Sequence, residues 1–95
     1  MYRQGDLLFT VLTSLPEGLS ERQDTIILEG EATGHCHRLL EGRVLEDKQG
    51  IRYLEAFYAT QIVHPEHQAI HLPAGCYRVT RQREYTPEAL REVRD

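Results

Sequence analysis

Short β-favouring runs separated by turn residues constrain the fold of this chain more than any other feature. The apolar run at residues 7–12 follows Gly5-Asp6, and later runs end at glycine or proline. Residues 43–47 and 51–56 flank Lys-Gln-Gly, a spacing typical of a hairpin with a left-handed glycine. We therefore predict an all-β fold, a small barrel or sandwich of about six to eight short strands.

The end of the chain has a different pattern. Residues 86–88 read Thr-Pro-Glu, which combines a capping hydroxyl, a proline at the first helical position and an acid in the first turn. Apolar residues at 89, 90 and 93 then give a narrow stripe, so we expect one short C-terminal helix at about residues 87–94. A chain of 95 residues has the size of one domain, and we expect residues 1–95 to form a single β domain with this helix.

Every histidine of the chain lies in one of two short stretches, HCH and HPEHQAIH. In an extended strand, side chains two residues apart face the same side, about 6.5 Å apart along the chain. His35 and His37 therefore present both imidazoles to one side, while the cysteine between them points the other way. Proline in the second stretch fixes the backbone and brings His64 and His67 around a tight bend.

These spacings predict a metal site of His35, His37 and one or both of His64 and His67. Neutral imidazole binds zinc, copper, iron and nickel, so we expect a divalent transition metal, with zinc ahead of iron, nickel or copper. His71 is an outside candidate, because an extended chain separates it from His67 by roughly 13 Å. A helical turn would instead place those two on one face.

Two glutamates complete the predicted set. Glu41 and Glu66 could add a carboxylate ligand to the imidazoles. If three protein ligands leave the fourth position open, the metal lowers the pKa of a bound water. Glu66 could then accept a proton from that water as the catalytic base, which would make the domain a metal-dependent hydrolase.

A purely structural role for the histidines is the alternative to a metal site. Histidines in small proteins are often surface residues, or core residues that donate to a backbone carbonyl, and a single His-x-His is weak evidence. Two clusters that contain every histidine favour a metal more strongly. The competing class of function is a non-catalytic interaction module that contacts a protein or nucleic-acid partner through its His and Arg faces.

The strand-like stretch YRVTRQREY places basic and aromatic side chains together. Arg81 and Arg83, beside Tyr77 and Tyr85, could hold phosphate or stack on bases. A formal net charge of −4 argues against nucleic-acid binding, so we prefer a solvated strand face with Arg–Glu pairs.

Composition and the N-terminal segment indicate the compartment. No apolar run reaches the length of about 18 residues that a membrane span needs, and residues 1–9 lack the apolar core of a signal peptide. We therefore expect a cytoplasmic protein without a membrane partner, in which Cys36 and Cys76 are reduced. A small-molecule or protein partner and a homodimer are both compatible with so small a core, and no residue pattern selects between them.

Two resemblances add to this interpretation. His35, His37 and Glu41, spaced HxHxxxE, resemble the first motif of the cupins, and the Pro-Ala-Gly turn at 73–75 resembles the second. That resemblance implies a divalent metal inside a β-barrel and an isomerase or oxygenase activity. The stretches GEATGHCHRL, HPEHQAIHLPAGCYRV and RQREYTPEAL also resemble small bacterial and phage proteins of unassigned function. This second resemblance implies a compact module and no particular chemistry.

Overall fold

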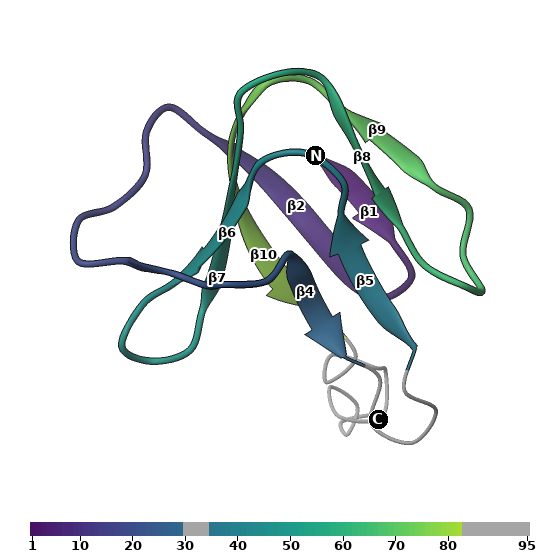
Figure 1. Ribbon diagram of the computed structural model, residues 1–95, viewed down its shortest axis with the longest axis horizontal. Helices are drawn as coiled ribbons and strands as arrows, with labels where there is room; N and C mark the ends of the chain where they lie inside the picture. The colour runs from purple at the N-terminus through teal and green to yellow at the C-terminus, as the bar shows by residue number, and fades with distance from the viewer. Residues whose placement is uncertain (30–34, 83–95) are drawn as a thin grey trace, which may run out of the picture.

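The structure, a computed structural model, describes residues 1–29 and 35–82, which form two antiparallel sheets (Figure 1). The larger sheet has six strands in the order β1-β2-β10-β7-β6-β3, and the smaller has four in the order β4-β5-β8-β9. The strands are β1 (Tyr2–Gln4), β2 (Leu7–Leu12), β3 (Ser20–Glu21), β4 (Ile26–Glu29), β5 (Cys36–Leu39), β6 (Arg43–Glu46), β7 (Arg52–Ala56), β8 (Thr60–Val63), β9 (Ile70–Leu72) and β10 (Gly75–Arg81).

The predicted all-β class is confirmed for these residues, and its finer details are corrected. The described chain has ten strands instead of six to eight, because β1, β3 and β9 are two or three residues long and exist through pairing with longer neighbours. Within the described chain the two sheets do not close into a barrel, so the sandwich alternative fits better. The helix expected at residues 87–94 lies outside the described residues.

One apolar core joins the two sheets. The larger sheet contributes buried side chains from β2, β6, β7 and β10, and the smaller sheet contributes them from β4, β5, β8 and β9. These side chains are Leu7, Phe9, Val44, Leu54, Tyr77, Ile27, Leu39, Ile62 and Leu72. Alternation along each strand produces this arrangement, because successive side chains point to opposite faces of a sheet.

The predicted hairpin at residues 43–56 is confirmed. β6 and β7 pair from Arg43↔Glu55 to Glu46↔Arg52, and Gly50 in the connecting turn has a φ of 88°. The carboxylate of Asp47 accepts hydrogen bonds from the backbone N–H groups of residues 49 and 51, both at 2.9 Å. The turn chemistry of the sequence therefore fixes the register of the two strands.

The smaller sheet places the histidine-rich stretches side by side. β5 pairs with β8 through Arg38↔Val63 and Leu39↔Ile62, and β8 pairs with β9 (Figure 1). The loop at residues 64–69 joins β8 to β9, so it leaves the sheet next to the first residues of β5. No helix in residues 1–29 and 35–82 is long and apolar enough to cross a membrane.

Candidate metal centre

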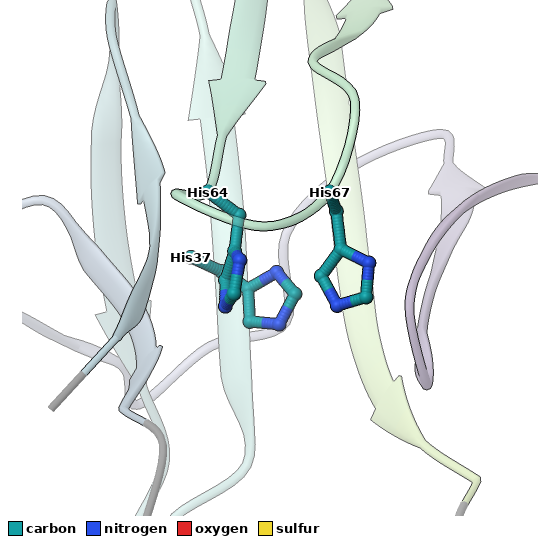
Figure 2. A group of neighbouring side chains, drawn as sticks. All are labelled: His37, His64 and His67. Carbon is teal, nitrogen blue, oxygen red and sulfur yellow. The ribbon is translucent and has the colours of Figure 1, made fainter. Parts of the chain in front are cut away.

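Three imidazoles converge beside the β8–β9 loop, those of His37, His64 and His67 (Figure 2). One nitrogen from each ring lies within 4.8 Å of the nitrogens from the other two. Ring centroids are 4.4 Å apart for His37 and His64, and 4.5 Å apart for His64 and His67. Tetrahedral zinc holds its ligand nitrogens about 3.3 Å apart, given metal–nitrogen distances of about 2.0–2.1 Å. The three nitrogens would therefore have to approach one another by up to about 1.5 Å to share one ion.

The three rings run from the core to the surface. His37 is the second residue of β5 and is buried, with 6% of its surface exposed. His64 follows the last residue of β8 and is half-buried, and His67 in the loop is exposed. An ion at this position would be anchored on the sheet by His37 and reached from solvent on the His67 side.

A buried amide orients the innermost imidazole. The side chain of Gln4, at the end of β1, is 3% exposed, and its Nε2 donates to the backbone carbonyls of Ile62 and Gln68, each at 2.9 Å. Its Oε1 lies 2.8 Å from Nδ1 of His37 and accepts a hydrogen bond from it, because the amide nitrogen is already committed to two carbonyls. His37 therefore carries its proton on Nδ1 and keeps the Nε2 lone pair for a metal, the usual arrangement behind a ligating histidine.

His64 is oriented by its own loop. The backbone N–H of Glu66 donates to Nδ1 of His64 at 3.0 Å, which puts the proton of the neutral ring on Nε2. Coordination through Nε2 would require the other tautomer and the loss of this hydrogen bond, at about 1 kcal/mol. Coordination through Nδ1 would replace the hydrogen bond with the metal. In either case the bend at Pro65 already holds His64 beside His67.

A glycine makes room for the third ring. Gly5, in the turn between β1 and β2, has a φ of 62°, a conformation that side chains rarely adopt. A Cβ atom built on it would lie 2.8 Å from Nε2 of His67 and 3.1 Å from its Cε1. The imidazole of His67 therefore packs directly against the backbone of this turn. Any larger residue at position 5 would displace the ring.

The electrostatics keep two of these rings neutral at pH 7. Burial, followed by the neighbouring His64 and His67, lowers the pKa of His37 to about 4. Burial is also the main cause of the lowered pKa of His64, followed by His67 and His35. The neutral imidazole is the form that binds a metal.

His35 and Glu66 border the three-histidine cluster. The ring centroid of His35 lies 5.8 Å from that of His64, in an edge-on arrangement. Its Nδ1 lies 3.4 Å from Oε2 of Glu66, which makes an ion pair when His35 is protonated. The structure thus brings His35, His37, His64 and His67 into one neighbourhood, with the carboxylate of Glu66 at its exposed rim.

The remaining metal candidates lie elsewhere. His71 and Glu41 are both exposed, and both line a separate cavity of about 230 Å³ that includes Leu40 and Thr60. Glu41 follows the end of β5 opposite to His37, and its backbone N–H donates to Oγ1 of Thr60 at 2.8 Å. Among the described residues, the metal-capable group contains neither of these two residues.

The structure describes one of the two arginines in the predicted phosphate or nucleic-acid face, Arg81, which is half-buried, and the neighbouring Tyr77 lies in the core. Nε of Arg81 lies 3.2 Å from the carboxylate of Asp6, so this guanidinium is paired with an acid. Arg83 lies outside the described residues.

Sequence reasoning missed Gln4 and treated Gly5 only as a turn residue. Both act through contacts with residues far along the chain. Gln4 is 33 residues from His37 and 64 from Gln68, and Gly5 packs against His67. The one local signal was a glycine directly after a glutamine in a turn between two strands, a pattern too common to indicate a site.

Comparison with known proteins gives a family without an assigned activity. A search of curated proteins and a search of solved structures each found no match. A family model described as a domain of unknown function, DUF8820, matches residues 3–82. The match gives no support to the cupin resemblance and agrees with the resemblance to proteins of unassigned function. Because it spans most of the sequence, the chain belongs to the DUF8820 family.

Proposed function

We propose that this domain binds one divalent transition metal ion, zinc by preference, through His37, His64 and His67. The convergence of three imidazole nitrogens carries the proposal. Imidazole suits zinc as well as iron, nickel and copper, and tetrahedral zinc accepts three such ligands with a fourth from elsewhere.

The hydrogen bonds behind the cluster favour a metal over histidines that only fill space. A core histidine needs one partner for its N–H, and a backbone carbonyl would serve. Here a buried side-chain amide fills that role and is itself held by two carbonyls, one of them at Gln68 in the β8–β9 loop. Gln4 thereby links the orientation of His37 to the position of the loop that carries the other two ligands.

A hydrolytic role is the second candidate. His67 is exposed, so the ion would have a solvent side on which a water could be the fourth ligand. Glu66 lies within the same loop and is exposed next to His35, where it could accept a proton from that water. If His35 supplied the fourth nitrogen instead, the site would be closed and structural.

Metal analysis of protein prepared without a histidine tag tests the proposal. We expect about one zinc ion per chain, and a loss of affinity of at least about 100-fold in the double variant His64→Ala/His67→Ala. His71→Ala is the matched control, because this histidine is exposed and outside the cluster. Equal loss of zinc in both variants, or a folded wild-type protein that takes up no zinc, would contradict the proposal.

A further inference from the structure

A second cavity adjoins the histidine cluster and shares one of its residues. It has a volume of about 400 Å³ and is lined by Cys36, Arg38, Val63, His64 and Pro65. That volume lies in the range of about 300–1,000 Å³ that is typical of small-molecule sites. His64 belongs to both the cavity wall and the three-histidine group, so a molecule in the cavity would lie beside the proposed ion.

Arg38 is the cationic side chain of this cavity. It lies on β5 between the buried His37 and Leu39, and alternation along the strand turns it to the opposite, exposed face. Four other described arginines each form an ion pair with an acid, namely Arg22, Arg43, Arg52 and Arg81. Arg38 has no ion pair within the described residues, so its guanidinium can receive an anion from outside the chain.

The rest of the lining selects the type of anion. Val63 and Pro65 offer apolar surface next to the guanidinium of Arg38. A guanidinium matches one carboxylate in a two-pronged hydrogen bond. A phosphate dianion would keep a second charge, and Arg38 is the only lysine or arginine among the described lining residues.

We infer that this cavity binds a small organic carboxylate with an apolar body, which is the ligand class of the neighbouring metal site. The carboxylate pairs with Arg38, the apolar body lies against Val63 and Pro65, and His64 lies between the molecule and the ion. This inference rests on the proposed metal function and adds to it the chemistry of the molecule that binds next to the metal site.

Benzoate and its neutral counterpart benzamide test the inference on zinc-loaded protein. Isothermal titration is expected to give benzoate a Kd at least about tenfold lower than that of benzamide, because only benzoate forms the charge-assisted pair. Arg38→Gln should remove this difference. Arg78→Gln should keep it, because Arg78 is also exposed and forms no ion pair among the described residues, but lies on β10 in the other sheet.

The outcomes separate the two proposals. Equal affinities for benzoate and benzamide, or equal effects of Arg38→Gln and Arg78→Gln, in a protein that retains its zinc would overturn the carboxylate site alone. Failure of the wild-type protein to take up zinc would overturn the metal function and this inference with it. Zinc affinity should be unchanged in Arg38→Gln, because Arg38 faces away from His37.

Discussion

Acid should destabilise the metal-free protein through His37. In the folded chain burial holds the pKa of His37 at about 4, whereas an unfolded histidine has a pKa of about 6.5. The unfolded state therefore binds a proton more readily than the folded state does. The contribution of neutral His37 to stability is fully present above about pH 6.5 and is lost as the pH falls toward 4.

The size of the effect follows from the two pKa values. Between pH 7 and pH 5, the difference in proton binding lowers the free energy of unfolding by about 2 kcal/mol, and the loss levels off at about 3 kcal/mol below pH 4. The lowered pKa of His64 acts in the same direction. A loss of about 2 kcal/mol is a large part of the stability of a small domain.

Chemical denaturation of the metal-free protein at pH 7 and pH 5 measures this loss. The matched variant is His37→Gln, whose amide can still donate to Gln4 but does not titrate. We expect the wild-type protein to lose about 2 kcal/mol more than His37→Gln over this range. Equal losses in the two proteins would refute the claim that a buried, neutral His37 is part of the folded structure.

Two further predictions concern the residues that support the cluster. Gly5→Ala should destabilise the fold by about 1 kcal/mol or more and weaken zinc binding, because its methyl group meets His67. Gly18→Ala is the control, since Gly18 has a φ of 84° with nothing within 4 Å of the added atom, and it should leave zinc binding unchanged. If both variants bind zinc equally, the ring of His67 does not depend on this turn. Gln4→Leu should lower zinc affinity by about 10- to 100-fold and release His37 from its Nδ1–H tautomer, which long-range ¹H–¹⁵N spectra report directly. A single unchanged Nδ1–H tautomer in that variant would argue against the role of Gln4.

The fold was predictable wherever local chemistry decides it. The turn before Ile51 is determined by local residues, the carboxylate of Asp47 and the positive φ of Gly50. The alternation of apolar residues determines which face of β5 is buried. The short strands β1 and β3 were not predictable, because they have no apolar run of their own and form only where a longer partner offers backbone groups. Whether the two sheets closed into a barrel or stayed open also depends on long-range packing.

The candidate site, like the fold, could be predicted from the sequence only in part. The two histidine stretches could be recognised by composition, and strand pairing of β5 with β8 explains why they meet. Sequence spacing gave His71 and Glu41 some weight as ligands, yet both line another cavity. His71 pairs with Gln61 near the start of β8, and Glu41 follows the end of β5, so both lie at the opposite end of these strands from the cluster. The role of Gln4 could not be predicted from local sequence patterns, because it depends on hydrogen bonds to three residues distant in the sequence.

The most direct test of the metal centre is a crystal structure of the zinc-loaded protein with anomalous diffraction data at the zinc edge. We predict one anomalous peak within about 2.0–2.1 Å of a nitrogen from each of His37, His64 and His67, with Nδ1 of His37 still bonded to Gln4. A folded protein in excess zinc with no peak at this cluster, or with zinc held at His71 instead, would contradict the assignment of these three ligands.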